Sequence, residues 1–220
     1  MNACKAEWRR AALAVVLVGL LIGGSIVMRT LAKRPVAGPP PVMIAVVGDS
    51  YSAGHNNQVV WPTLLAQRTG WSVANFAQPN AGFAVDEQGG HAFSYQVQRA
   101  AQVHPRAIVI MSGTADVTAA YSGAIDATAA DALQRIQLTG AEALVIGPTW
   151  YGTDIPEALR ILSTEIHKAA DTAGVPFLDA LDPPWLTIDQ MQADLGGATD
   201  AGQSVIADKV AAWLRSEVTQ

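Results

Sequence analysis

The chain has 220 residues, of which half are hydrophobic and 15% are charged. This length suits one domain of ordinary size, and this composition excludes a disordered, highly charged chain. Residues 1–34 hold six basic residues and one acid, so the remaining 186 residues carry 8 basic and 18 acidic groups. Such an acidic domain repels nucleic acid and anionic lipid head groups, so we expect no nucleic-acid partner.

An uncharged apolar run of 18 residues lies near the N-terminus, at residues 11–28. That length is close to the minimum for a helix that crosses the hydrocarbon core of a membrane. We predict a single-pass transmembrane anchor (an uncleaved signal), with residues 1–10 as a cytoplasmic tail and the domain on the extracytoplasmic side of the cell membrane. The alternative is a cleaved signal peptide and a secreted protein. In both cases residues 29–42 form a proline-rich tether and residues 43–220 form the exported domain.

Short apolar segments alternate with helical stretches along this domain. In chain order, strands are expected at residues 43–47, 71–76, 107–111, 143–146 and 175–178. Helices are expected between and after them, at residues 61–68, 94–103, 125–138, 155–173 and 202–218. This alternation predicts a three-layer α/β domain, in which a five-stranded parallel sheet has helices on both faces. Ligands of such sheets bind beyond the carboxyl ends of the strands, so the residues that follow each strand form the candidate site.

The segment GDSYSAG, at residues 48–54, directly follows the first predicted strand. A serine on a tight strand-to-helix turn is exposed at the edge of the sheet, and its N–H points toward developing negative charge. Asp49 is placed to hold this turn by hydrogen bonds. The segment resembles the first sequence block of the SGNH/GDSL hydrolases, which have a flavodoxin-like fold, and this resemblance implies that Ser50 is the nucleophile. The competing interpretation makes Ser50 a turn residue or a helix N-cap.

The second and third blocks of that family are altered in this chain. Asn80 stands where the family has a glycine whose N–H binds the oxyanion, and Gly82 follows two residues later. Asparagine tolerates left-handed backbone better than most residues, so the donor N–H can be retained at Asn80. In the third block Gly113 is kept, but Ala115 replaces the asparagine whose side chain donates to the oxyanion. The resemblance therefore implies an oxyanion site that has lost one donor.

The last block departs furthest from the family pattern. Counting back from the predicted final helix places Asp194 at the family's aspartate and Gly197 at its catalytic histidine. No histidine follows His167 in the chain, so no other register supplies one. Serine is a poor nucleophile without a general base, and loss of a triad histidine can lower kcat roughly a millionfold. His55 and His91 are the candidates for a substitute base, and each is otherwise a polar loop residue.

Two functions follow from the resemblance. The first is hydrolysis of lipid or carbohydrate esters of the cell envelope through Ser50, with catalysis impaired by the losses at Gly197 and Ala115. The second is a non-catalytic relative that binds acylated or glycan ligands, or a protein partner, through the same cleft. An unrelated flavodoxin-like domain with a phosphate-binding loop is disfavoured, because no Lys or Arg lies near Asp49. We expect no cofactor and no metal ion.

Overall fold

The computed structural model describes residues 41–86 and 89–218. The predicted tail, the predicted anchor and most of the tether fall within residues 1–40, which lie outside the described residues. In the part of the chain that is described, no helix is both long enough and apolar enough to cross a membrane.

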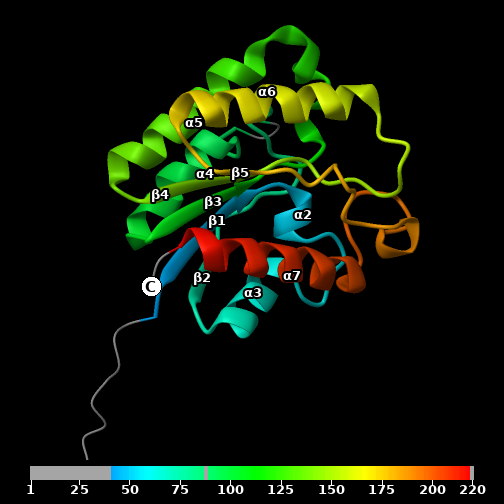
Figure 1. The fold of residues 1–220 in the computed structure, drawn as a ribbon, viewed down its shortest axis with the longest axis horizontal. Coiled ribbons are helices and arrows are strands. Elements are labelled where there is room, and N and C mark those ends of the chain that lie inside the picture. The colour runs from blue at the N-terminus through cyan, green and yellow to red at the C-terminus, as the bar shows by residue number, and fades with distance from the viewer. Residues whose placement is uncertain (1–40, 87–88, 219–220) are drawn as a thin grey trace, which may run out of the picture. The chain divides into compact units, whose positions relative to one another are not determined.

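The predicted strands form one parallel sheet in the order β2-β1-β3-β4-β5 (Figure 1). They are β1 (Met43–Gly48), β2 (Ser72–Asn75), β3 (Ala107–Met111), β4 (Glu142–Ile146) and β5 (Phe177–Leu178). This order is the flavodoxin-like one, as predicted. Strands β1 and β3 lie side by side within the sheet and are almost wholly buried, which agrees with their continuous apolar sequences.

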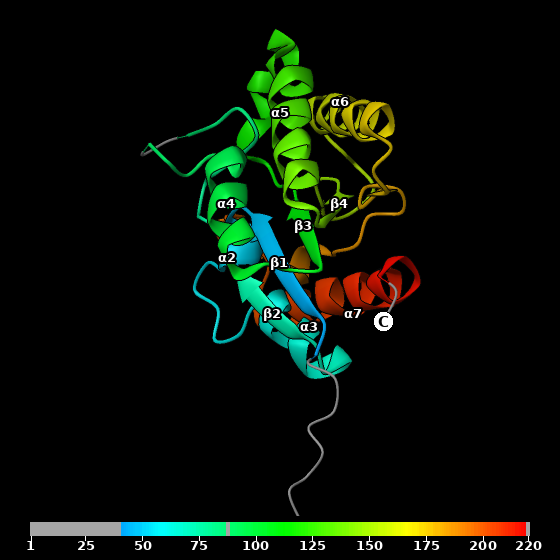
Figure 2. The ribbon, with the colours of Figure 1, turned by 90° about the vertical axis from the view of Figure 1, so that its left-hand side faces the viewer.

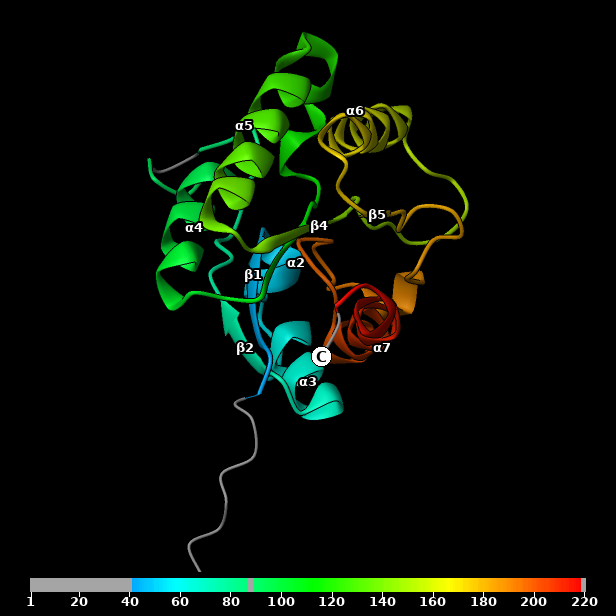
Figure 3. The same cartoon turned by 60° about the vertical axis from the view of Figure 1, so that its left-hand side comes forward.

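Helices cover both faces of the sheet (Figures 2 and 3). They are α2 (Ser50–Ala53), α3 (Trp61–Thr69), α4 (Phe93–Ala100), α5 (Ala124–Thr139), α6 (Glu157–Ala173) and α7 (Asp200–Glu217). Helices α4, α5 and α6 pack on one face, and α3 and α7 pack on the other. Successive residues of β1 point to opposite faces, so Val47 joins the first core and Val46 joins the second. The predicted three-layer architecture is confirmed.

Some boundaries differ from the predicted ones for local reasons. Helix α6 begins at Glu157, two residues later than predicted, because Ile155 precedes Pro156 and a residue before proline avoids the helical region. Strand β5 also begins two residues late, at Phe177, because Pro176 has no N–H to donate to a neighbouring strand. The helix expected at residues 94–103 ends in a 3-10 turn at Ala101–Val103. The short helix α2 was not predicted, nor were three other 3-10 turns, at Ala115–Val117, Ala119–Ser122 and Ile188–Gln190.

The parallel register brings the first and third sequence blocks together. Gly48, the last residue of β1, pairs with Met111, the last residue of β3. The chain leaves the sheet at both positions, so Asp49 and Ser112 emerge at the same edge. The candidate residues of the two blocks therefore lie at the carboxyl end of the sheet, as expected for this fold.

Candidate active site

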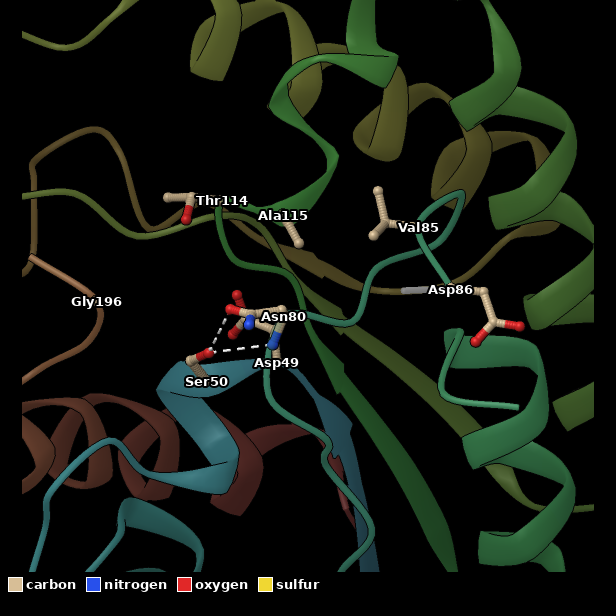
Figure 4. Close-up of a pocket in the computed structure, with 8 residues that line it drawn as sticks. All are labelled: Asp49, Ser50, Asn80, Val85, Asp86, Thr114, Ala115 and Gly196. Atoms are coloured by element: carbon tan, nitrogen blue, oxygen red, sulfur yellow. Dashed lines mark hydrogen bonds between the residues drawn. The ribbon is translucent and has the colours of Figure 1, made fainter. Parts of the chain in front are cut away.

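The turn after β1 presents Ser50 as the first residue of helix α2. Asp49 is the N-cap of this helix, because its Oδ1 accepts a hydrogen bond from the Tyr51 N–H at 3.0 Å. The interpretation of Ser50 as a helix N-cap is therefore wrong. The Ser50 side chain instead faces a cavity (Figure 4).

Two buried glutamines, which no sequence motif identified, hold this turn from opposite faces of the sheet. Gln96 of α4 accepts from the Gly48 N–H at 2.9 Å and donates to the Gly48 carbonyl at 3.0 Å. Gln203 of α7 accepts from the Trp61 N–H at 2.8 Å and donates to the Tyr51 carbonyl at 3.0 Å. Both amides are fully buried and bonded at both ends, as buried polar groups must be for stability. The main chain on either side of Ser50 is thereby held in place.

Asn80 approaches Ser50 from the loop after β2 (Figure 4). Its main-chain N–H donates to the Ser50 Oγ at 3.2 Å, and the Ser50 hydroxyl donates to the Asn80 Oδ1 at 3.4 Å. Asn80 has a φ of 54°, the left-handed backbone that was expected for this replacement of glycine. An N–H at this place faces the region where negative charge develops when the serine oxygen attacks a carbonyl group. Asn80 thus places a main-chain N–H beside the Ser50 Oγ without the family's glycine.

The carboxyl group of Asp49 is buried against Gly113 of the third block. A Cβ at position 113 would overlap this carboxyl group, so only glycine fits there. Burial raises the pKa of Asp49 to about 7, although hydrogen bonds from the N–H groups of Tyr51 and Thr114 act in the opposite direction. Gly113 therefore makes room for the side chain that caps α2.

Gly82 makes room for Asp116 in a similar way, because a Cβ at position 82 would overlap the Asp116 carboxylate. That carboxylate accepts hydrogen bonds from Phe83, Ala84 and Val85, with N···O distances of 2.5, 3.0 and 3.1 Å. The N–H of Gly82 donates to the Val85 carbonyl at 3.1 Å and is not directed at Ser50. Gly82, a candidate oxyanion residue from the sequence, therefore shapes the loop, and the N–H that reaches Ser50 comes from Asn80.

Ser50 lies in the wall of an open cavity of about 400 Å³. The cavity is lined by Asp49, Ser50, Asn80, Val85, Asp86, Thr114, Ala115 and Gly196. Ala115, which the sequence resemblance assigns to the position of the family's asparagine, contributes only a methyl group (Figure 4). Two lining residues are acidic and none is basic, so the cavity is unfavourable for anions. Within residues 41–86 and 89–218, no group of three or more His, Cys, Asp or Glu side chains is placed to hold a metal ion.

His55 and Asp194, which are 139 positions apart in the sequence, form a hydrogen-bonded pair with a distance of 2.6 Å between Nε2 and Oδ2. Asp194 Oδ1 also accepts from the Gly196 N–H at 2.9 Å. The Gly196 bond, and after it the His55 bond, hold the pKa of Asp194 below its ordinary value. Gly197, which the sequence resemblance assigns to the family's histidine position, lies beside this pair, since a Cβ there would stand 3.1 Å from the His55 Cβ. The structure thus brings His55 to the last sequence block.

His91 has different surroundings. Its main-chain N–H donates to Asp86 Oδ1 at 2.6 Å, and the main-chain N–H groups of Gly90 and Ala92 also donate to the Asp86 carboxylate. These bonds shape the loop and hold the pKa of Asp86 below its ordinary value, with the His91 N–H as the largest cause. As far as the chain is described, neither His91 nor His55 is among the residues that line the cavity. The two candidate bases differ in that the His55 ring is hydrogen-bonded to the carboxylate of Asp194, whereas His91 bonds Asp86 through its main-chain N–H.

Comparison with known proteins agrees with this geometry. The model of the GDSL-like lipase/acylhydrolase family matches residues 46–204, a range that contains every sequence block described above. The chain belongs to this family. It is also similar to a GDSL lipase of Mycobacterium tuberculosis, with 26% identity over 225 residues that cover 92% of this chain and 94% of that protein.

Solved structures of lower sequence identity share the fold. TesA matches with a TM-score of 0.67 and 22% identity, over 80% of this chain and 99% of that chain. An acetyl xylan esterase matches with a TM-score of 0.61 and 16% identity, over 79% of this chain and 100% of that chain. Family membership therefore agrees with the parallel five-stranded sheet and with Ser50 on the turn that follows its first strand.

Proposed function

We propose that this protein is an ester hydrolase that acts on lipid or carbohydrate esters of the cell envelope through Ser50. The observation that carries this proposal is the 3.2 Å contact between the Asn80 N–H and the Ser50 Oγ in the wall of an open cavity. A serine oxygen and a main-chain donor at hydrogen-bond distance are the core requirement for acyl transfer through a tetrahedral intermediate.

In this mechanism the Ser50 Oγ attacks the carbonyl carbon of the ester, and its proton passes to a general base. The N–H groups of Asn80 and of Ser50 itself, which begins α2, stabilise the oxyanion that forms. The alcohol leaves with a proton, and water then attacks the acyl-enzyme to release the carboxylic acid. Ala115 supplies no side-chain donor, and loss of one such donor lowers kcat about a hundred- to a thousandfold. Turnover should therefore be slower than in relatives that keep the asparagine.

The charge of the cavity favours uncharged esters as substrates. Asp49 and Asp86 line the cavity, and Asp194 is bonded to Gly196 at its wall. A phosphate or sulfate group close to the scissile bond would be repelled by the carboxylates of Asp86 and Asp194, and also by Asp49 at a pH above its pKa of about 7. The similarity to proteins described as a GDSL lipase and as an acetyl xylan esterase supports lipid or carbohydrate esters as the substrate class.

We further propose that residues 11–28 anchor the protein in the cell membrane and that the domain is extracytoplasmic. The uncharged run of 18 residues supports this placement. The protein should stay with the membrane fraction after alkaline extraction, and a protease added to spheroplasts should digest the domain. A shortened chain recovered from the medium would instead support a cleaved signal peptide and a secreted protein.

A second candidate function is supported by Ala115 and Gly197, which stand where the family has its asparagine and histidine. In this case the cleft binds acylated or glycan ligands, or a protein partner, without hydrolysis. The same cavity would then hold a ligand but release no product.

Hydrolysis of p-nitrophenyl acetate and p-nitrophenyl butyrate by the full-length chain in mild detergent separates these two functions. Turnover should be lost in Ser50→Ala and retained in Ser216→Ala, a control in which the hydroxyl donates to the Trp213 carbonyl on an exposed part of α7. Equal rates in the wild type and in Ser50→Ala would contradict the hydrolase function and favour the binding function.

A further inference from the structure

The side chain of His55 lies next to Gly197, the position that the resemblance assigns to the family's histidine. Gly197 is buried, and a Cβ at this position would lie 3.1 Å from the His55 Cβ and 3.8 Å from the Ser50 carbonyl oxygen. A side chain at position 197 and the side chain of His55 would therefore start from neighbouring points beside the main chain of the nucleophile. The loop after α2 thus places an imidazole in the region that the last sequence block serves in the family.

Asp194 and Gly196 determine the direction of the His55 ring. Its Nε2 lies 2.6 Å from the Asp194 Oδ2. A Cβ on Gly196 would stand 3.1 Å from the same Nε2, so the ring packs directly against the main chain of Gly196. Gly196 lines the cavity that Ser50 faces. The ring therefore packs behind a residue that lines the cavity, in space that a larger residue at position 196 would restrict, although His55 is not itself among the described lining residues.

The main chain of His55 is also fixed. Its N–H donates to the Asn57 Oδ1 at 2.9 Å, and its carbonyl accepts from the Gln192 Nε2 at 2.8 Å. The side chains of His55 and Asp194 are 35% and 59% exposed, and ion pairs as exposed as this one contribute little to stability. A role in catalysis explains this positioning better than a role in folding does.

We propose that His55 is the general base and general acid for Ser50, in place of the histidine that the family carries at position 197, and that Asp194 is its positioning residue. This inference rests on the proposed hydrolase function. An ionised carboxylate only accepts hydrogen bonds, so Nε2 of His55 carries the proton that it shares with Asp194. The other ring nitrogen, Nδ1, is then the free proton acceptor.

The proton transfers balance in both halves of the reaction. Nδ1 takes the Ser50 proton as the bond from Oγ to the carbonyl carbon forms, and it protonates the leaving alkoxide as the ester C–O bond breaks. In the second half Nδ1 takes a proton from the attacking water and returns it to Oγ as the acyl bond breaks. In this structure the Ser50 hydroxyl donates to the Asn80 Oδ1, so the transfer requires either a turn of this hydroxyl toward His55 or one bridging water.

Steady-state hydrolysis of p-nitrophenyl acetate by full-length variants in mild detergent tests this assignment. His55→Ala should lower kcat about a hundred- to ten-thousandfold, with KM and the melting temperature close to the wild-type values. Asp194→Asn should lower kcat by a smaller factor and leave KM unchanged. His167→Ala is the matched control, because His167 stacks on Phe177 rather than facing the site, and His91→Ala tests the rival base.

Two rescue experiments, in which activity is restored to a variant that lacks His55, distinguish a catalytic imidazole from a structural one. Free imidazole should restore part of kcat in His55→Gly and should not raise kcat in the wild type. The double variant His55→Gly/Gly197→His should exceed His55→Gly, because removal of one side chain leaves room for the other and Gly197 does not have a left-handed backbone.

The outcomes separate this inference from the proposed function. If Ser50→Ala abolishes turnover but His55→Ala keeps the wild-type kcat, the hydrolase function stands and His55 is not the base. A loss in His91→Ala alone would assign the base to His91. If neither Ser50→Ala nor His55→Ala changes the rate, the proposed function itself is contradicted. Should circular dichroism show that His55→Ala is unfolded, His55→Gln, which keeps a donor for Asp194, takes its place with the same outcomes.

Discussion

Replacement of Asp49 by asparagine should change the way in which the stability of the domain depends on pH. The Asp49 side chain is buried at the start of α2, and burial raises its pKa from 3.8 to about 7. Between these two values the folded chain binds more protons than the unfolded chain, so the free energy of unfolding falls as the pH rises. At 1.36 kcal/mol for each pH unit, the loss between pH 3.8 and pH 7 amounts to about 4 kcal/mol.

Urea unfolding of the full-length wild type and of Asp49→Asn, followed by tryptophan fluorescence in mild detergent from pH 4 to pH 8, measures this effect. The asparagine also keeps only one of the two acceptor oxygens, but this loss does not titrate and shifts the whole curve by a constant amount. Asp116 is present in both proteins, and its charge is one of the smaller causes that raise the pKa of Asp49. As the pH rises from 4 to 8, the free energy of unfolding of the wild type should therefore fall relative to that of the variant, by up to about 4 kcal/mol. Two curves that stay parallel throughout would refute the burial argument for Asp49.

Three further substitutions test the loops around Ser50. Asn80→Gly keeps the N–H donor and suits the left-handed φ of 54°, so kcat should stay near the wild-type value. A large fall of kcat in esterase assays would mean that the Asn80 side chain is needed. Ala115→Asn should raise kcat on p-nitrophenyl acetate by roughly a hundredfold with KM unchanged, and a folded variant without any gain would contradict the assignment of the third block. Gly113→Ala should lower the free energy of unfolding by about 1–3 kcal/mol, because its Cβ would overlap the Asp49 carboxyl group. An unchanged urea midpoint would show that this contact is not tight.

Much of the fold follows from local sequence pattern. The continuous apolar run of β3 predicts a buried parallel strand, and its bounds Ala107–Met111 are those predicted. The left-handed backbone of Asn80 could likewise be expected, because it depends on the conformational tolerance of a single residue. Where proline intervenes, as at Pro156 and Pro176, helix and strand begin later than the apolar pattern alone indicates.

The contacts that complete the site depend on residues far apart in the chain. Gln96 reaches Gly48 across 48 positions, and nothing in the sequence around Gln96 marks it as a partner of the nucleophile turn. His55 and His91 are both polar loop residues, and only the folded chain shows that His55 meets Asp194. Gly82 and Gly113 occupy expected blocks, but the carboxyl groups for which they make room come from other loops.

The central claim is that Ser50 is an active nucleophile, and covalent labelling tests it most directly. The full-length chain is incubated with a fluorophosphonate, digested, and analysed by mass spectrometry to locate the phosphonate adduct. We predict one adduct, on the peptide that contains Ser50, and none in Ser50→Ala. A wild-type protein that stays unlabelled at Ser50 under conditions that label a control serine esterase would contradict the claim.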